Sequence, residues 1–555
     1  MTTAHKTQVH RATRRTARTA PSASFRLTYA TMFDPPEIVH QHYDRALAKT
    51  KAHLGQTYGM FINGHDHFTD ETFEDRSPID TGWLLGTFAK GGRAEAEAAL
   101  SAAQAAFPKW AALKWPARVS LLRKAAANIE KRLFEMAAAD SLEVGKNRME
   151  ALGDVQETAD LFNYACDQME INEGYLKPMG TDPLKGYQVT NLSILRPYGP
   201  WVVISPWNFP VALAGGPTGA ALVAGNTVVL KTASDTPWVG RLLAECLRDA
   251  GLPDGVFNFV TGPGATLGQA LIDDPRVAGV TFTGSYDVGM NLLRAMHHGR
   301  WPRPCLAEMG GKNPCLVTQN ADLDVAAMGI IRSAFGLQGQ KCSATSRLFV
   351  HQSVKAKLLQ KLLARIEDIR IGDPTQRENW MGPVVNATQY RDFDVYCGEL
   401  SAAGEVLYGG HKLAGSTPEG FDFSRGYFCE PTVVDGVPPE HRLWQHEMFL
   451  PIVMVEGFDD LDQAFARAND VAYGLTAGFY GSRREAEQFF DRIEAGVVYA
   501  NRPQGASTGA WPGFQPFGGW KGSGTTGKNA GGLYYLPQYL REQSRTLVAP
   551  PGKSG

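Results

Sequence analysis

Cysteine is scarce in this sequence, with seven in 555 residues, and the cysteines follow no recognisable pattern. They are odd in number, widely scattered, and include no CxxC pair and no cluster with histidine at the spacing of zinc ligands. Disulfide-rich secreted proteins and small zinc domains both need such patterns. We therefore expect a reduced, cytoplasmic protein with no metal site. The cysteines are Cys166, Cys246, Cys305, Cys315, Cys342, Cys397 and Cys429.

Long apolar runs and a charge excess are also missing. No apolar stretch reaches the roughly 18 residues that a membrane-spanning helix needs. The 55 basic and 57 acidic residues leave a net charge of −2. The balance indicates no membrane partner and no nucleic-acid partner, because such proteins usually carry a basic surface.

Acidic residues are absent from the first 30 positions, which carry six basic residues among Ser, Thr and Ala. No apolar segment typical of a secretory signal follows. Three interpretations stay open: a transit peptide, which would direct the protein to the mitochondrial matrix; a disordered bacterial leader; or an upstream start codon, with Met32 as the true start. We expect residues 1–32 to be a disordered basic leader.

The chain that follows is first helical and then alternating. We expect a helix within 33–55, a short strand at 58–64 closing on an Asn-Gly turn, and helices through 92–174. Pro108 and Pro116 are expected to break these helices, with Gly145 and Gly153 as further candidate breaks.

Strands and helices alternate from residue 198 onward, which predicts a parallel, doubly wound sheet with ligands at the carboxyl ends of its strands. A second α/β region follows residue 315. We also expect the segment 185–197 to be extended and to pair with a tail at 531–548 that is strand-like around residues 534–536 and 545–548. The predicted strands are 201–204, 227–230, 256–260, 280–283, 315–317, 347–350, 451–455 and 476–480; the predicted helices are 215–224, 237–250, 322–335, 354–369, 386–403, 460–469 and 483–495.

One short stretch, residues 339–344 (GQKCSA), presents Cys342 among small polar residues after an apolar run. Such a setting suits an accessible thiol, although most lone cysteines are inert core residues. The glycines Gly262, Gly264 and Gly268 follow a GxGxxxG spacing, which fits a strand–helix turn as well as a phosphate loop.

Six motifs that follow one another along the chain favour a functional role for Cys342 over that of an inert core residue. They are SPWNFP at 205–210, KTAS at 231–234, FTGS at 282–285, LAEMGGK at 306–312, GQKC at 339–342 and EMF at 447–449. Together they resemble the aldehyde dehydrogenase superfamily over residues 33–548. The resemblance implies an α/β fold with a doubly wound NAD(P)-binding domain (33–182 and 198–307), an α/β catalytic domain (308–520) and a small β flap for oligomerisation (183–197 and 526–548).

The chemistry of aldehyde oxidation gives three of these residues a role. The Cys342 thiolate would attack the carbonyl to form a thiohemiacetal and then a thioester. In the family, the Asn208 amide and the Cys342 backbone N–H stabilise the oxyanion. Glu308 resembles the base that activates water for hydrolysis. Read alone, Asn208 is an ordinary loop amide.

The resemblance also implies a cofactor site for NAD, with NADP possible. Ser234 stands where many NAD-specific relatives carry a Glu that would repel a 2′-phosphate. Thr232 replaces a common Pro and Leu450 a common Gly, which leaves the seating of the cofactor open. The implied cofactor residues are Ile204, Ser205, Pro206, Trp207, Lys231, Ser234, Gly264, Gly268, Gly284, Ser285, Glu447 and Phe449.

The segment 507–521 resembles the 1-pyrroline-5-carboxylate (L-glutamate γ-semialdehyde) dehydrogenases. In those enzymes the substrate carboxylate is held by backbone N–H groups of a Gly-Ala pair and by the serine after the nucleophile. Gly509, Ala510 and Ser343 stand at these positions here and together would form an anion nest. The alkyl chain would lie between Phe209 and Phe517, with Glu157 near the entrance of the site. Leu161 replaces a common Phe, and the 501–508 loop is longer than usual.

The resemblance therefore predicts NAD(P)-dependent oxidation of L-glutamate γ-semialdehyde to L-glutamate in proline catabolism, by a homodimer or a dimer-based oligomer. The alternatives are another carboxylated semialdehyde, such as succinate semialdehyde, or a broad range of aldehydes. Acylating and phosphorylating relatives usually lack the base that Glu308 resembles. A non-catalytic protein on this fold would have lost Cys342, Glu308 or Asn208.

Overall fold

The computed structural model of the protein describes residues 26–29, 31–503 and 510–550. Its first large sheet has seven strands in the order β12-β11-β8-β9-β10-β2-β3. The strands β8 to β12 run parallel, and β2 and β3 add an antiparallel edge. The order reverses beside β8, which is where doubly wound sheets bind ligands. The strands are β2 (Met60–Ile62), β3 (His65–His67), β8 (Pro200–Ile204), β9 (Thr227–Lys231), β10 (Phe257–Val260), β11 (Gly279–Thr283) and β12 (Cys305–Glu308).

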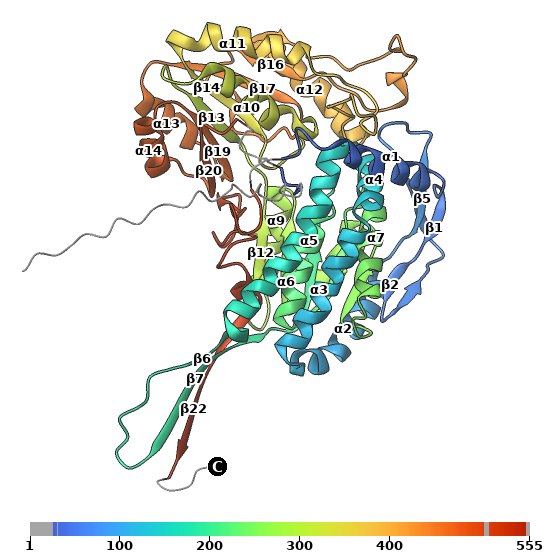
Figure 1. Ribbon diagram of the computed structural model, residues 1–555, viewed down its shortest axis with the longest axis vertical. Helices are drawn as coiled ribbons and strands as arrows, with labels where there is room; N and C mark the ends of the chain where they lie inside the picture. Colours follow the sequence, from blue (N-terminus) through green and yellow to red (C-terminus); the bar gives the residue numbers. More distant parts are fainter. Residues whose placement is uncertain (1–25, 30, 504–509, 551–555) are drawn as a thin grey trace, which may run out of the picture.

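Helices cover both faces of this sheet (Figure 1). Alternate side chains along each strand serve the two faces: Val203 and Leu230 face one core, whereas Val202 and Val229 face the other. Strands buried on both sides need the near-continuous apolar runs that predicted them. One layer contains α3 (Trp115–Lys131), α4 (Leu133–Val144), α5 (Arg148–Ile171), α6 (Ala212–Ala224) and α7 (Pro237–Asp249); the other contains α2 (Arg93–Ala112), α8 (Gln269–Asp273) and α9 (Tyr286–His297).

Two of the four predicted helix breaks are wrong. Pro108 lies inside α2, and Gly153 lies inside α5. Pro116 stands in the first turn of α3, and Gly145 ends α4 in the left-handed conformation. The alanine-rich buried face of α2 keeps that helix intact past its proline, because packing outweighs one missing hydrogen bond.

The second large sheet also has seven strands, in the order β15-β16-β17-β14-β13-β19-β20, and all but β15 run parallel. We call the first large sheet with its helices the first unit, and this second sheet with its helices the second unit. Figure 1 shows the second unit stacked on one end of the first. The strands are β13 (Asn313–Val317), β14 (Thr345–His351), β15 (Glu405–Tyr408), β16 (Thr432–Asp435), β17 (Ile452–Phe458), β19 (Thr476–Tyr480) and β20 (Val497–Ala500); the helices are α10 (Leu323–Phe335), α11 (Gln352–Glu367), α12 (Ala387–Ala403), α13 (Leu461–Asn469) and α14 (Arg483–Arg492).

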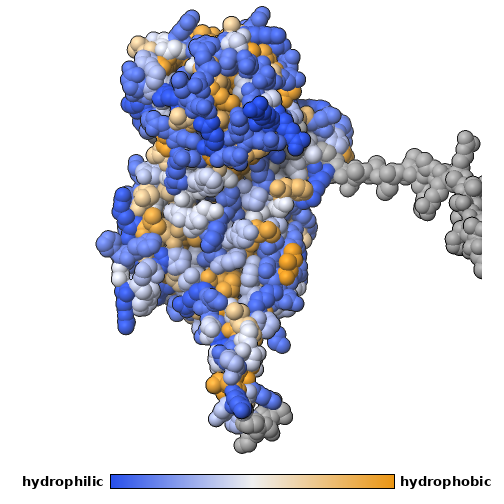
Figure 2. Space-filling model, turned by 90° about the vertical axis from the view of Figure 1, so that its left-hand side faces the viewer, coloured by the Kyte–Doolittle hydropathy of each residue, from blue (hydrophilic) through white to orange (hydrophobic). Residues whose placement is uncertain are grey.

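A three-stranded flap projects from the opposite end of the molecule (Figures 1 and 2). It consists of β6 (Leu176–Pro178), β7 (Gln188–Pro197) and β22 (Leu540–Ala549), so the predicted pairing of 185–197 with the tail is confirmed. Its bounds differ from the prediction, since the flap begins at Leu176 and its last strand at Leu540. Residues 534–536 form no strand, because the tail turns into a short helix (Leu536–Tyr539) that packs Tyr539 against Trp201.

The N-terminal segment also departs from the prediction. Leu27, Tyr29 and Met32 are buried, so the described part of the predicted disordered leader packs on the protein core. Helix α1 (Glu37–Lys51) follows, and a small sheet joins β1 (Gln56–Tyr58), β4 (Thr72–Arg76) and β5 (Leu84–Ala89). A two-stranded ribbon joins β18 (Tyr473–Gly474) and β21 (Trp520–Lys521). Among the described helices, none has the length and apolar character to cross a membrane.

Candidate active site

Cys342 lies in a loop with an unusual backbone. Leu337, Gln338 and Gly339 are all left-handed, with φ values of 48°, 54° and 68°. A side chain at Gly339 would place its Cβ 2.3 Å from the carbonyl oxygen of Leu450, so only glycine allows this approach. The buried Gln338 amide holds the turn by donating to the carbonyls of Gly145 and Pro383 at 2.9 and 2.7 Å. Strain of this kind persists where the surroundings enforce it.

Buried side chains hold the loop on both sides of the thiol. The Lys341 ammonium donates to Glu150 at 2.9 Å, and the same carboxylate accepts the Leu337 N–H at 3.2 Å. Asn313 donates to the carbonyls of Cys342 and Ala344, both at 2.8 Å. The sulfur is thus presented by a rigid frame, which catalysis by a positioned nucleophile requires.

Glu308, at the end of β12, lies beside this thiol. The Cys342 sulfur is 4.0 Å from the nearer Glu308 carboxyl oxygen. Burial raises the pKa of Cys342 well above its ordinary value, as do Glu308 and Glu447, while the N–H groups of Ser343 and Cys342 oppose that shift. Burial also raises the pKa of Glu308 to about 8. Both groups therefore hold their protons more firmly than usual, so the thiol must lose its proton before it can act as a nucleophile, and the carboxyl group must be ionised before it can act as a base.

Asn208 stands in the loop between β8 and α6, with its amide donating to the Gln340 carbonyl at 3.1 Å. The amide nitrogen carries a second hydrogen, which this bond leaves available. Asp154 fixes the other end of the loop by accepting the N–H groups of Val211 and Ala212 at 3.4 and 2.8 Å. The Asn208 loop and the Cys342 loop are therefore linked directly to each other.

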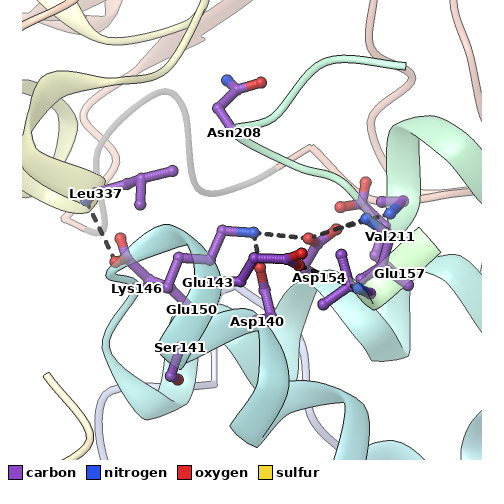
Figure 3. A network of polar contacts seen from close by, with 12 residues as sticks. Asp140, Ser141, Glu143, Lys146, Glu150, Asp154, Glu157, Asn208, Val211 and Leu337 are labelled. Atoms are coloured by element: carbon purple, nitrogen blue, oxygen red, sulfur yellow. Dashed lines mark hydrogen bonds and ion pairs between the residues drawn. The ribbon is translucent and has the colours of Figure 1, made fainter. Parts of the chain in front are cut away.

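A fully buried charge cluster lies beneath both loops (Figure 3). The Lys146 ammonium contacts Asp140 at 2.9 Å and Asp154 at 2.6 Å, and all three side chains have no exposed surface. Burial opposes the charge on Lys146, but the two carboxyl groups outweigh it and raise the lysine pKa. Burial raises the pKa of Asp140 well above its ordinary value, and the Lys146 ammonium opposes that shift. Sequence reasoning missed this cluster, because nothing local distinguishes its three residues.

Replacement of Lys146 by Met is expected to lower the free energy of unfolding by about 3 kcal/mol, because it leaves the buried Asp140 and Asp154 carboxyl groups without their cation. Chemical denaturation measures this. Lys124→Met, on the exposed side of α3, is the control and should change stability by less than about 0.5 kcal/mol. Equal stability of the two variants would show that the cluster does not hold the loops.

Several residues of the predicted cofactor site meet at the carboxyl edge of the first sheet. The register places Ile204 beside both Lys231 and Phe282. Lys231 is buried and donates to the Thr232 carbonyl at 3.0 Å, and burial lowers its pKa to about 8. Within the described residues, the buried Ser205 hydroxyl finds no hydrogen-bond partner. Unused buried donors at this edge fit the hydroxyl-rich riboses of a dinucleotide.

The predicted phosphate-binding residues lie at two strand–helix turns. Gly264 and Gly268 bound a short π-helical turn, and a Cβ at Gly268 would lie 3.5 Å from the Lys231 side chain. Ser285 begins α9 without capping it through its hydroxyl, which leaves the helix N-terminus open to an anion. Gly284 packs against the Phe282 ring, and Ser234 is exposed in the turn after β9.

Glu447 and Phe449 face this edge from the second unit. Glu447 accepts the Gly311 N–H at 2.7 Å, and burial raises its pKa to about 7. Phe449 has a positive φ of 58° and packs edge-on against Trp207, with ring centroids 5.3 Å apart. Leu450 points into the hydrophobic core of the second unit, so its side chain does not occupy the cofactor edge.

A cavity joins the predicted catalytic and substrate residues. Residues from both large units line it, and Glu308 also lines a second cavity. Gly509 lies outside the described residues, so its predicted role stays a prediction. The predicted residues in the cavity wall are Cys342, Glu308, Ser343, Ala510, Phe209, Phe517, Glu157 and Leu161, and the unpredicted ones include Tyr29, Trp511 and Gln515.

Within the described part of the chain, no group of three or more His, Cys, Asp or Glu side chains is placed to hold a metal ion. The cavity wall offers a thiol and a carboxyl group, a pair that suits acyl chemistry at a carbonyl carbon. Asn208 is not part of this wall, but its loop is hydrogen-bonded to the Cys342 loop through the Gln340 carbonyl.

Comparisons with known proteins agree with this geometry. The profile of the aldehyde dehydrogenase family matches residues 66–544. A 1-pyrroline-5-carboxylate dehydrogenase of Geobacillus sp. (strain WCH70) is 38% identical over 511 residues, covering 91% of this chain and 95% of the relative. A crystal structure of 1-pyrroline-5-carboxylate dehydrogenase from Thermus with bound NAD has a TM-score of 0.88 at 37% identity, covering 95% of this chain and 99% of that one. The proline utilization A protein from Bdellovibrio bacteriovorus has a TM-score of 0.85 at 33% identity, covering 91% of this chain and 51% of that one.

Proposed function

Since the chain belongs to the aldehyde dehydrogenase family, we propose that it oxidises L-glutamate γ-semialdehyde to L-glutamate with NAD, as a step of proline catabolism. One observation carries the proposal. A single cavity is lined by a thiol, a base, a candidate carboxylate grip and two aromatic rings. The Geobacillus relative and the Thermus structure named above both carry the name of this activity.

In this proposal the Cys342 thiol first releases its proton to water, and its sulfur then attacks the aldehyde carbon as a thiolate. The oxyanion that forms accepts hydrogen bonds from the free hydrogen of the Asn208 amide and from the Cys342 backbone N–H. NAD, when bound, supplies a hydride acceptor, and the substrate is then held on Cys342 as a thioester. Glu308 takes a proton from water, which adds to the thioester and releases the acid. The distance of 4.0 Å between the Cys342 sulfur and the Glu308 carboxyl oxygen supports this mechanism, because both groups must reach the same carbonyl carbon of the substrate.

The substrate grip follows from the walls of the same cavity. The Ser343 hydroxyl and the Ala510 N–H would hold the α-carboxylate, and the alkyl chain would lie between Phe209 and Phe517. Glu157 provides a carboxyl group that would bind the α-ammonium in its ionised form. A substrate with an aldehyde at one end and a zwitterion at the other matches these three zones.

The cofactor proposal rests on the first sheet and on Glu447. The riboses would meet Lys231 and Glu447, and the pyrophosphate the N-terminus of α9. Ser234 leaves the turn after β9 without an acidic side chain at its position, which tolerates a 2′-phosphate as well as a 2′-hydroxyl. The first large unit would thus be the NAD(P)-binding domain and the second the catalytic domain.

A substrate panel tests the proposed function. Purified protein should oxidise L-glutamate γ-semialdehyde with a kcat/KM at least about tenfold above those for succinate semialdehyde and propanal, because an unmatched buried charge costs more than 1 kcal/mol or so. Absorbance of the reduced cofactor follows the reaction. Equal efficiency on all three aldehydes would contradict the assignment of the substrate.

We also propose a homodimer, or an oligomer built from dimers, in the cytoplasm. The flap exposes large apolar side chains, which a lone protomer would leave in water (Figure 2). A long edge strand such as β22 is a ready partner for a second chain. Analytical ultracentrifugation should give at least twice the chain mass, and a monomer at micromolar concentration would contradict this assembly. The exposed flap residues are Leu176, Met179, Leu184, Tyr187, Leu547 and Val548.

A further inference from the structure

Tyr29, from the N-terminal segment, forms part of the wall of the catalytic cavity. Its side chain is buried, with 7% of the residue surface exposed. Its hydroxyl donates to the Glu157 carboxyl at 2.7 Å. Its ring meets Phe209 and Trp511 edge-on, with centroids 6.3 and 5.2 Å apart. The Tyr29 side chain therefore contacts both Phe209, one of the two rings proposed to hold the alkyl chain, and Glu157, the acid proposed to bind the ammonium group.

The surroundings hold this ring in place. Asp160 accepts from both Arg26, at 3.0 Å, and the Trp511 indole, at 2.8 Å, which ties the N-terminal segment to the loop that carries Ala510. Helix α5 makes room through Gly153, where a Cβ would lie 2.6 Å from the Tyr29 ring. A glycine inside a helix costs stability, so this close approach is the physical reason for a glycine that does not break α5.

The electrostatics of Glu157 make its partner important. Burial raises the pKa of Glu157 to about 8, and the Asp154 and Glu308 carboxyl groups add to the shift. The Tyr29 hydrogen bond and the Lys146 ammonium oppose it. Burial raises the pKa of Tyr29 well above its ordinary value, so the hydroxyl stays protonated and acts as a donor. A donor to the charged carboxylate favours the form that binds a cation.

We propose that Tyr29 is a specificity-determining residue, which orients the Glu157 carboxylate toward the α-ammonium of the substrate and closes the cavity wall beside it. This inference rests on the proposed function, because only an amino-acid semialdehyde brings an ammonium group to that zone. It assigns the segment before Met32 to the substrate pocket. A chain that began at Met32 would lack this wall.

The test compares two aldehydes of equal length: L-glutamate γ-semialdehyde, and glutarate semialdehyde, which lacks only the ammonium group. Tyr29→Phe keeps the ring and removes the donor. We expect it to raise KM about tenfold for the amino-acid semialdehyde and by less than about twofold for glutarate semialdehyde, with kcat changed little, since the hydrogen bond serves a charged group. Tyr29→Ala, which also opens the wall, should raise KM for both substrates.

Tyr43→Phe is the matched control. It removes another buried tyrosine hydroxyl, which donates to Ser141 at 2.7 Å and lies outside the cavity wall, and it should leave both KM values unchanged. Equal changes of KM on the two aldehydes in Tyr29→Phe, or no change on either, would overturn the inference.

Inhibition by the matched acids separates this inference from the proposed function. Tyr29→Phe should weaken inhibition by L-glutamate about tenfold relative to glutarate, against whichever aldehyde the protein oxidises best, because only L-glutamate carries the ammonium. A wild-type protein indifferent to L-glutamate γ-semialdehyde would contradict the proposed function. An unchanged ratio of the two inhibition constants would overturn the role of Tyr29.

Discussion

Replacement of Cys342 by Ser is expected to abolish aldehyde oxidation, with a fall in kcat of at least about 10⁴-fold. A neutral hydroxyl is a far weaker nucleophile than a thiolate, and among the described residues of the cavity wall Cys342 is the only thiol that can form the thioester. Reduced cofactor is measured by absorbance under steady-state and single-turnover conditions. Both should show no turnover, since the first step is lost.

Cys397→Ala is the control, because Cys397 is a buried thiol on α12 that lies outside the catalytic cavity. It should keep wild-type rates. Retained turnover in Cys342→Ser, with cofactor still binding, would remove the thiol mechanism altogether.

Replacement of Glu308 by Gln is expected to slow the steady state about 10³-fold while leaving hydride transfer nearly intact, because a carboxamide fills the same space but cannot accept a proton from water. The thioester then accumulates on Cys342. Rapid-mixing absorbance should show a burst of reduced cofactor, of about one equivalent per active site, followed by a slow phase. Equal losses in burst rate and steady state would show that Glu308 acts before hydride transfer.

The pH profile gives the same prediction a second test. Burial raises the pKa of Glu308 to about 8, so below that pH the carboxyl holds its proton and cannot act as a base. The rate of hydrolysis of the thioester should therefore rise with pH and level off above about pH 8. In Glu308→Gln this rise should vanish, because the titrating group is gone.

Local sequence patterns predicted much of the fold for a physical reason. Strands such as β8 and β9 are buried on both faces, so they need unbroken apolar runs that a single sequence displays. The same patterns failed where packing overrode local preference. Pro108 and Gly153 stay helical because tertiary packing stabilises the unbroken helices α2 and α5. The neighbouring residues in the sequence give no sign of that packing.

The flap and the N-terminal segment show the same division. The pairing of β7 with the tail followed from alternating side chains, but the start of β22 depended on Tyr539 packing against Trp201. The basic composition of residues 1–32 predicted a disordered leader, yet Leu27, Tyr29 and Met32 are buried. Composition reports average character, whereas burial depends on which surface a few side chains can reach.

For the site, short motifs and the family they resemble pointed to Cys342, Glu308 and Asn208 as the candidate thiol, base and amide donor, because aldehyde oxidation needs one group of each kind. Only the tertiary structure brought Lys146 under both loops and Tyr29 against Glu157. Tyr29 and Glu157 are 128 positions apart in the sequence, and no local propensity links them. The types of residue in a motif indicate the reaction, but how helices and strands pack decides which distant residues come into contact.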